Sequence, residues 1–243
     1  MSVRGGPAWA GGVAAGAVLA WGLPSVSILL EPVRRALDVR ASVVARDGVG
    51  LTFDDGPHPQ GTPAVLSALA DYGAQATFFL VGEQVVRHPE LVHEIRDAGH
   101  EIALHCDRHR NSMRLTPRQL RDDLDRAHER IAAAAGESPR RYRPPYGVLP
   151  TTAWREARRR GWETVLWRSN GRDWRARATP ASIAGRLLDG VAGGEVLLLH
   201  DADYYSAPGS WRRTADGLRI VLESLAARRL AVHSLAGAGG TLP

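Results

Sequence analysis

Polar residues that are costly to bury stand at or just after the ends of several short apolar segments in this chain. These residues are Asp54, Asp55, His105, Arg143, Asp173 and His200. In a parallel α/β barrel the carboxyl ends of the strands lie on one face, where the loops build active sites. The repeated placement predicts that these side chains gather at one site.

Two of these segments have the composition and spacing of a metal site. His105 and His109 are four residues apart, so both imidazoles can reach one metal from a helical turn or a tight loop. A carboxylate from Asp54 or Asp55 completes an open set of two histidines and one acid, which leaves a position for water. Because successive side chains of a strand point in opposite directions, one acid can bind the metal while the other acts as a base.

The order of the motifs resembles that of a known family. The segments are Thr52-Phe53-Asp54-Asp55-Gly56-Pro57, His105 to His109, Arg143-Pro144-Pro145-Tyr146-Gly147, Asp173-Trp174 and Leu198-Leu199-His200. Together they are similar to the polysaccharide deacetylases of the NodB-homology type, carbohydrate esterase family 4. The resemblance spans residues 49–234. It implies a hydrolase that removes N-acetyl groups from an N-acetylglucosamine-type polysaccharide, such as a chitooligosaccharide or peptidoglycan.

The resemblance implies a metal centre beside a general base. Asp55, His105 and His109 would hold a divalent metal, usually zinc in this family, with cobalt as an alternative. Asp54 would be the general base, and Arg143 would orient it. Bound zinc lowers the pKa of its water to about 7, so that a base as weak as Asp, with an ordinary pKa of about 3.9, can accept the proton.

The resemblance also implies a general acid and a binding pocket. His200 would protonate the leaving nitrogen, and Asp173 would hold its ring and favour the imidazolium. Tyr146 would donate its backbone N–H to the developing oxyanion. Trp174 and Leu198 would form the wall of the pocket for the acetyl methyl group.

Short apolar segments alternate with helical periodicity from Gly48 onward. The predicted strands are residues 49–53, 76–81, 101–104, 141–143, 163–167, 195–199 and 230–234. Helical periodicity is clearest at 117–135 and 214–229. This alternation predicts a parallel sheet, open or closed into a barrel. The resemblance implies a distorted (β/α) barrel of about seven strands, in a single catalytic domain that follows an N-terminal hydrophobic segment.

Local signals predict where the helices begin and end. Thr62-Pro63, Thr116-Pro117 and Thr179-Pro180 each offer a capping hydroxyl followed by a proline at the first helical position. Helices are expected to stop at four glycines, which are Gly73, Gly99, Gly136 and Gly161.

Aromatic residues divide into a loop set and an interior set. The loop set is expected at the face of the active site, where rings can stack on the C–H faces of a sugar: Tyr146, Trp174, Tyr204, Tyr205 and Trp211. For Tyr204 and Tyr205, ordinary loop packing is an equally good interpretation. The interior set lies in predicted strands and is expected in the core: Phe53, Phe78, Phe79 and Trp167.

The N-terminal part of the chain indicates a membrane segment or an export signal. Residues 8–30 carry no charge and are long enough to span about 30 Å of hydrocarbon as a helix. We therefore expect residues 1–42 to be a signal or membrane anchor with a linker. Residues 43–236 would form the deacetylase domain and residues 237–243 a flexible tail.

The charges around the uncharged stretch and the position of the expected substrate favour opposite locations for the catalytic domain. Arg34, Arg35, Arg40 and Arg46 follow the uncharged stretch and only Arg4 precedes it, which favours a cytoplasmic domain. An acetylated polymer of the cell envelope, however, lies outside the cytoplasm. We give the substrate more weight and expect a membrane-anchored or exported catalytic domain that faces outward.

Composition excludes several classes of protein. The 243 residues are 44% hydrophobic and 23% charged, which is unlike a disordered or fibrous chain. The 31 residues counted as Lys and Arg are all Arg, and 26 acidic residues leave a net charge of +5. Because the arginines are scattered among acids, we interpret them as a solvated surface and expect no nucleic-acid partner. The one cysteine, Cys106, excludes an internal disulfide. We expect a monomer whose partners are an acetylated glycan and the membrane.

Other functions remain open on the same residues. An O-acetyl esterase acting on xylan, or a hydrolase of small cyclic amides, would use the same metal, base and acid. An iron(II) oxygenase would take His105, Asp107 and His200 as its ligands, which leaves the Asp pair and His109 without a role. A catalytically silent glycan-binding module would need neither base nor acid. Metal content and acetate release from chitooligosaccharides, peptidoglycan and acetylxylan discriminate among these functions.

Overall fold

Parallel strands form the framework of this molecule, and their carboxyl ends lie at the candidate functional site. The computed structural model describes residues 22–28, 30–43 and 45–237, and within them nine strands form one sheet. The strands are β1 (Val39–Arg40), β2 (Gly48–Asp54), β3 (Thr77–Val81), β4 (Glu101–Cys106), β5 (Arg141–Tyr142), β6 (Glu163–Val165), β7 (Ser169–Asn170), β8 (Val196–His200) and β9 (Ala231–His233). Their order is β1-β6-β5-β4-β3-β2-β8-β7, with β9 paired to β2, and all of these pairings are parallel. The distorted (β/α) barrel is therefore confirmed.

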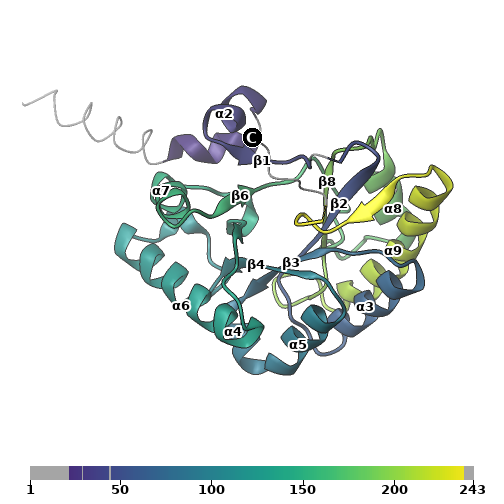
Figure 1. The fold of residues 1–243 in the computed structure, drawn as a ribbon, viewed down its shortest axis with the longest axis horizontal. Helices are drawn as coiled ribbons and strands as arrows, with labels where there is room; N and C mark the ends of the chain where they lie inside the picture. Colours follow the sequence, from purple (N-terminus) through teal and green to yellow (C-terminus); the bar gives the residue numbers. More distant parts are fainter. Residues whose placement is uncertain (1–21, 29, 44, 238–243) are drawn as a thin grey trace, which may run out of the picture.

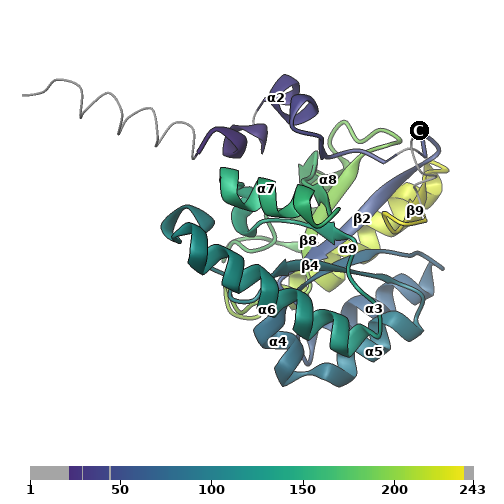
Figure 2. The same cartoon turned by 60° about the vertical axis from the view of Figure 1, so that its left-hand side comes forward.

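Helices cover the outer side of the sheet. They are α2 (Glu31–Ala36), α3 (Gly61–Asp71), α4 (Gly82–Arg87), α5 (Pro89–Asp97), α6 (Pro117–Ala135), α7 (Thr151–Arg159), α8 (Pro180–Leu188) and α9 (Ser210–Ala227), together with the short 3-10 helices η1 (Leu23–Ile28), η2 (Ser112–Arg114) and η3 (Pro145–Gly147). In Figure 1 they form an arc from α7 through α6, α4 and α5 to α3, α9 and α8, with the strands inside it. Figure 2 shows α6 and α7 running side by side.

The predicted strands match the observed ones, and two more are present. Each predicted strand overlaps one of β2, β3, β4, β5, β6, β8 and β9. The additional strands β1 and β7 have two residues each, too short to carry a periodic pattern, and they form the edges of the sheet. β1 lies in the segment expected as a linker and pairs with β6, and its Val39 is buried.

Two of the three predicted helix starts are confirmed, and one is wrong. Thr116 and Thr179 form capping boxes at the starts of α6 and α8. Helix α3 instead begins at Gly61, before the expected Thr62-Pro63 pair. The Thr62 hydroxyl does not cap a helix, because it donates to the buried Asp201 carboxylate at 2.5 Å and accepts from the His58 N–H at 2.8 Å.

The four glycines expected to end helices all have positive φ angles. Gly136, with φ of 78°, is the left-handed C-cap of α6 and accepts a conformation that a side chain would strain.

The central strand β2 fixes the relative positions of the catalytic candidates. All seven of its residues are buried, and the rings of Phe53 and Phe78 stack with centroids 5.1 Å apart. Its register with β8 places Asp54 opposite His200 at the carboxyl ends of the two strands. Strand pairing alone thus makes neighbours of Asp54 and His200, which are far apart in the sequence.

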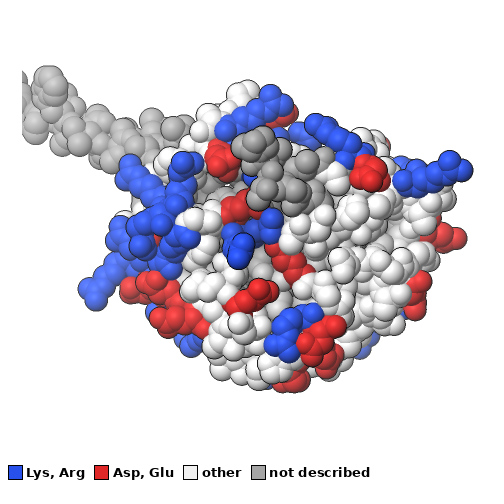
Figure 3. Space-filling model, viewed as in Figure 1, with Lys and Arg blue, Asp and Glu red and all other residues white. Residues whose placement is uncertain are grey.

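Arginine side chains are more clustered on the surface than their scattered positions in the sequence suggest. Figure 3 shows a group of basic side chains on the side of the molecule where α7 lies, with acidic side chains adjoining it. Arg155, Arg158 and Arg159 of α7 are exposed. Glu156 of the same helix is buried and accepts hydrogen bonds from Arg121 and Arg159. Part of this positive charge is therefore neutralised within the helix pair α6 and α7.

The expected membrane segment and the tail lie mostly outside the described residues. Of residues 8–30, positions 22–28 and 30 are described, and 23–28 form η1. A search of the described part of the chain finds no helix long and apolar enough to cross a membrane. The tail residues 238–243 are likewise outside the described ranges.

Candidate metal centre and active site

A cavity of about 240 Å³ opens at the carboxyl ends of the strands. It is lined by Asp54, Asp55, His105, His109, Tyr146, Trp167, Trp174, Leu198, His200, Tyr205 and Ser206. Every predicted site residue except Arg143 and Asp173 lines it, and each of these two bonds a residue that does. A larger cavity of about 360 Å³, between α2 and the segment after β6, contains none of the predicted site residues. The chemistry therefore belongs to the smaller cavity.

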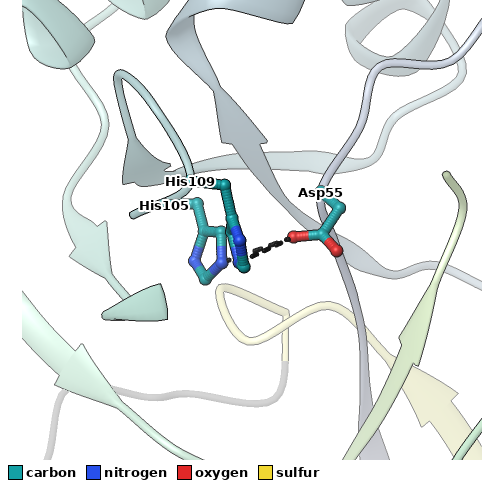
Figure 4. Close-up of side chains that lie close together, drawn as sticks. All are labelled: Asp55, His105 and His109. Atoms are coloured by element: carbon teal, nitrogen blue, oxygen red, sulfur yellow. Dashed lines mark ion pairs between the residues drawn. The ribbon is translucent and has the colours of Figure 1, made fainter. Parts of the chain in front are cut away.

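Asp55, His105 and His109 converge on one point in this cavity. His105 comes from β4 and His109 from the loop after it, while Asp55 follows β2 with a positive φ of 81°. The Asp55 Oδ1 atom lies 3.5 Å from His105 Nε2 and 3.3 Å from His109 Nε2. Figure 4 shows the carboxylate and the two rings pointing toward one another. Ligand atoms of all three residues lie within 4.8 Å of one another, which is compact enough for one ion.

The charge states of this cluster fit a cation. Burial lowers the pKa of both imidazoles to about 3, so they are neutral ligands, and the positive Arg143 and the neighbouring His105 add to the shifts of His105 and His109 respectively. Burial also raises the pKa of Asp55 to about 7. Its Oδ1 atom is buried and has no hydrogen-bond partner in the described part of the chain. An orphaned carboxylate oxygen facing two neutral imidazoles is a donor set that a divalent metal would satisfy.

Arg143 holds the second acid of the pair. Its guanidinium is fully buried and donates to Asp54 Oδ1 at 2.6 Å and to Thr52 Oγ1 at 2.8 Å. It also donates to two backbone carbonyl oxygens, those of Val165 and Leu166, at 3.1 and 3.3 Å. With this many bonds the guanidinium has one orientation, and it fixes the position of the Asp54 carboxylate beside it.

His200 and Asp173 form a second charge pair. Asp173 Oδ1 lies 3.0 Å from His200 Nδ1, and its Oδ2 accepts from the His200 backbone N–H at 2.7 Å and from the Thr214 hydroxyl at 3.0 Å. Burial alone disfavours the charged imidazolium, but the Asp173 carboxylate outweighs it and raises the pKa of His200 to about 10. The His200 ring is therefore a proton carrier that stays charged at neutral pH.

Aromatic and apolar side chains form the walls. The Trp174 ring meets His200 edge-on with centroids 5.4 Å apart, and Leu198 is buried beneath the cavity. Tyr146 has a positive φ of 60° and is 55% exposed at the rim. A left-handed backbone at a non-glycine residue is a strained conformation of the kind that clusters at functional sites.

Two aromatic expectations need correction. Trp167 was expected in a strand and in the core, but β6 ends at Val165, and the half-buried Trp167 lines the cavity. Trp211 was expected on a loop at the active-site face, but it lies in the first turn of α9 and packs near His58. For the tyrosine pair both interpretations were open: Tyr204 packs against His58, whereas Tyr205 lines the cavity.

One buried acid near the site was not predicted. Asp201 follows His200 directly, is fully buried, and binds the Thr62 hydroxyl. A side chain in place of Gly56 would collide with its carboxylate, at 2.4 Å from Oδ2. Asp201 therefore packs directly under the Asp54-Asp55-Gly56 turn. Its position right after the strand-end histidine was the available signal.

The alternative iron site is not assembled. The Asp107 carboxylate is buried, and its two oxygens accept from Arg130 at 2.6 Å and from Arg126 at 3.1 Å. Asp107 is thus engaged by helix α6 and does not offer a ligand to the cavity that His105 and His200 line.

Comparisons with known proteins agree with this geometry. The sequence model of the family described as polysaccharide deacetylase matches residues 42–165. A chitooligosaccharide deacetylase of Bradyrhizobium sp. (strain ANU 289) is 33% identical over 197 residues, which cover 77% of this chain and 88% of the relative. A peptidoglycan-N-acetylglucosamine deacetylase of Bacillus cereus is 36% identical over 155 residues, 63% of this chain and 72% of the relative.

Solved structures give the same result for the fold. The crystal structure of a peptidoglycan N-acetylglucosamine deacetylase in complex with 4-naphthalen-1-yl-N-oxidanyl-benzamide superposes with a TM-score of 0.79 at 26% identity, covering 86% of this chain and 95% of that one. A family 4 carbohydrate esterase from Streptomyces lividans, solved with acetate, gives a TM-score of 0.69 at 30% identity, covering 81% and 97% of the two chains. The chain belongs to the polysaccharide deacetylase family, carbohydrate esterase family 4, and is a hydrolase.

Proposed function

We propose that this protein is a metal-dependent deacetylase that removes N-acetyl groups from a polysaccharide containing N-acetylglucosamine. The observation that carries the proposal is the convergence of three metal-ligand candidates with an Arg-held carboxylate and an Asp-held histidine around one cavity. The two curated relatives named above are deacetylases of chitooligosaccharides and of peptidoglycan, which share N-acetylglucosamine as the acetylated sugar.

Asp55, His105 and His109 hold the metal, for which we propose zinc, with cobalt as a functional substitute. The ion supplies Lewis acidity, which polarises the acetyl carbonyl and acidifies water. The protein contributes a buried anionic oxygen and two neutral imidazoles that are already turned toward one point. The Arg143 carbonyl oxygen, 2.7 Å from His105 Nδ1, keeps the proton of that ring on Nδ1 and leaves Nε2 free to bind.

Asp54 accepts the proton of the attacking water. Arg143 holds this carboxylate in one position at 2.6 Å, so the base needs no reorganisation when the reaction begins.

His200 donates a proton to the leaving amine nitrogen. Its Nδ1 faces Asp173, so Nε2 is the ring nitrogen available to the substrate. The high pKa of His200 keeps that proton in place at neutral pH, and amide cleavage requires it because an unprotonated amine anion is a very poor leaving group. Trp174 and Leu198 enclose the acetyl methyl group, while the Tyr146 backbone N–H donates to the oxyanion.

Acetate release from defined substrates tests the proposal. Chitooligosaccharides, peptidoglycan and acetylxylan are compared side by side with metal-loaded and chelator-treated protein. We expect release from the first two, its loss with chelator and its return with Zn²⁺ or Co²⁺. Activity confined to acetylxylan would assign an O-acetyl esterase instead, and full activity of metal-free protein would overturn the metal-dependent mechanism.

We further propose that the catalytic domain, residues 43–236, faces the outside of the cell and is held there or exported by the apolar N-terminal stretch. Support comes from the uncharged residues 8–30 and from relatives named for a cell-wall polymer.

A further inference from the structure

The two candidate histidine ligands are held in different ways. His105 has a hydrogen-bond partner behind it, because its Nδ1 lies 2.7 Å from the Arg143 carbonyl oxygen. His109 has none. Its Nδ1 is buried and has no hydrogen-bond partner outside its own residue in the described part of the chain. Metal-binding histidines ordinarily have such a partner to fix the ring, so something else must fix His109.

Two tyrosine rings occupy the space around the imidazole of His109. The Tyr205 ring stacks on it with centroids 4.4 Å apart and planes 16° apart. The Tyr146 ring meets it edge-on, at 4.5 Å and 67°. A ring pressed flat against another restricts rotation about the bonds that would swing the imidazole out of its plane.

The stacking ring is itself anchored at its far end. The Tyr205 hydroxyl donates to Glu83 Oε1 at 2.7 Å and accepts from Gln84 Nε2 at 3.1 Å. Gln84 is buried, and the Glu83 backbone N–H also donates to the Asp107 carbonyl oxygen at 3.0 Å. The start of α4 therefore holds both Tyr205 and the loop that carries His109.

We propose that Tyr205 is a positioning residue for the metal centre: its ring, anchored to Glu83 and Gln84, keeps the His109 imidazole turned so that Nε2 faces Asp55. This inference rests on the proposed metal site and adds a residue from the loop after β8 that contacts a ligand without binding the metal. Stacking takes the place of the hydrogen bond for which His109 Nδ1 has no partner within residues 22–28, 30–43 and 45–237. The neighbouring Tyr204 packs against His58, with centroids 5.0 Å apart, and meets the Tyr205 ring only at a tilt, with centroids 6.2 Å apart. It therefore provides a control from the same loop.

The test measures metal affinity directly. The Kd for Zn²⁺ is determined by competition with a chromophoric chelator for the wild type, Tyr205→Leu, Tyr205→Phe and the control Tyr204→Leu. We expect Tyr205→Leu to weaken Zn²⁺ binding about 10- to 100-fold, as removal of an outer-shell partner does. Tyr205→Phe, which keeps the ring and loses the anchor, should lie between it and the wild type. Tyr204→Leu should bind as the wild type does.

The visible absorption spectrum of Co²⁺-loaded protein gives a second readout. It should change in Tyr205→Leu and be largely restored in Tyr205→Phe, because the ring orients the ligand. Circular dichroism of the metal-free variants identifies any that fail to fold, and Tyr205→Phe then carries the comparison. Unchanged Zn²⁺ affinity and Co²⁺ spectrum in Tyr205→Leu, with only KM raised, would overturn the inference and assign Tyr205 to sugar binding. Equal weakening by Tyr204→Leu would also overturn it.

If the proposed metal-dependent function is wrong, the same measurements give a different result. In that case the wild type itself binds no Zn²⁺, whereas failure of the present inference leaves wild-type binding intact and independent of residue 205.

Discussion

The Nδ1 atom of His200 lies 3.0 Å from Asp173 Oδ1, and the other oxygen of the same carboxylate accepts from the His200 backbone N–H. Asp173 thus orients the imidazole and its backbone together. The carboxylate is fully buried, while the His200 side chain is 13% exposed toward the cavity. This arrangement separates the two ring nitrogens into one that is held and one that can exchange a proton with a substrate.

Replacement of Asp173 by Asn should move the alkaline limb of the activity profile. With the carboxylate present, the pKa of His200 is raised to about 10, so the imidazolium persists well above neutral pH. Without it, burial disfavours the charged ring and the proton is lost at lower pH. We expect the alkaline limb of kcat/KM against pH to move down by about 1–3 pH units. An unchanged alkaline limb would show that His200 does not supply the proton.

Substitutions of the proposed base and of a proposed metal ligand should affect turnover and metal binding differently. Asp54→Asn should reduce kcat by a factor of about 10²–10⁴ and leave Zn²⁺ bound, because the ligand atoms come from other residues. His105→Ala should lose the metal as well. Zinc content and acetate release are measured on the same preparations, with thermal unfolding as a control for the loss of Arg143's ionic partner. Loss of zinc from Asp54→Asn would reverse the assignment of the two acids.

Asp55 should destabilise the protein when no metal is bound. Its pKa rises from 3.8 to about 7 on folding, so the folded state binds the proton more tightly than the unfolded state. Stability attributable to this group is therefore lost as pH rises from about 4 to about 7, and the penalty is complete above that range. At about 1.4 kcal/mol for each tenfold difference in proton affinity, the penalty is about 4 kcal/mol at most.

Asp55→Asn should accordingly be more stable than the wild type at pH 8 in chelator, with a smaller gain at pH 5. Urea unfolding at the two pH values measures the difference. The charge of Asp201 helps to raise the pKa of Asp55, so the gain also contains the relief of repulsion between these two carboxylates. Saturating Zn²⁺ should stabilise the wild type and not the variant. A variant less stable than the wild type at pH 8 would contradict the cost assigned to the buried carboxylate.

The arrangement of the strand ends could be predicted because it depends on chain order alone. Parallel pairing brings the carboxyl ends of β2, β4 and β8 to one face whatever the details of packing, so Asp54, His105 and His200 had to be neighbours. The spacing of His105 and His109 then left few other arrangements for the two rings.

The predictions from sequence fail where the local pattern does not determine the structure. Thr62-Pro63 has the local pattern of a helix start, but the Thr62 hydroxyl is bound by Asp201, 139 residues away in the sequence. Trp167 continues the apolar run of β6, and periodicity cannot show that the strand ends two residues earlier at Val165.

The contact between Tyr205 and His109 could not be predicted from the sequence either. It requires the loop after β8 to fold across the loop after β4, and the tyrosine anchor to come from α4. Sequence spacing within any one segment carries no information about this three-way contact.

Two opposing features bear on the side of the membrane on which the catalytic domain lies. Arg34 and Arg35 belong to the described helix α2, and η1 beside it contacts α7, so the end of the apolar stretch is close to the folded domain. Four arginines after the stretch and one before it favour retention in the cytoplasm. Access to an envelope polymer requires the opposite orientation, and we expect this requirement to prevail. Protease added to intact spheroplasts should then degrade the domain, while a cytoplasmic marker protein survives. Protection of the domain until detergent is added would place it inside and redirect the search for substrate to cytoplasmic acetylated sugars.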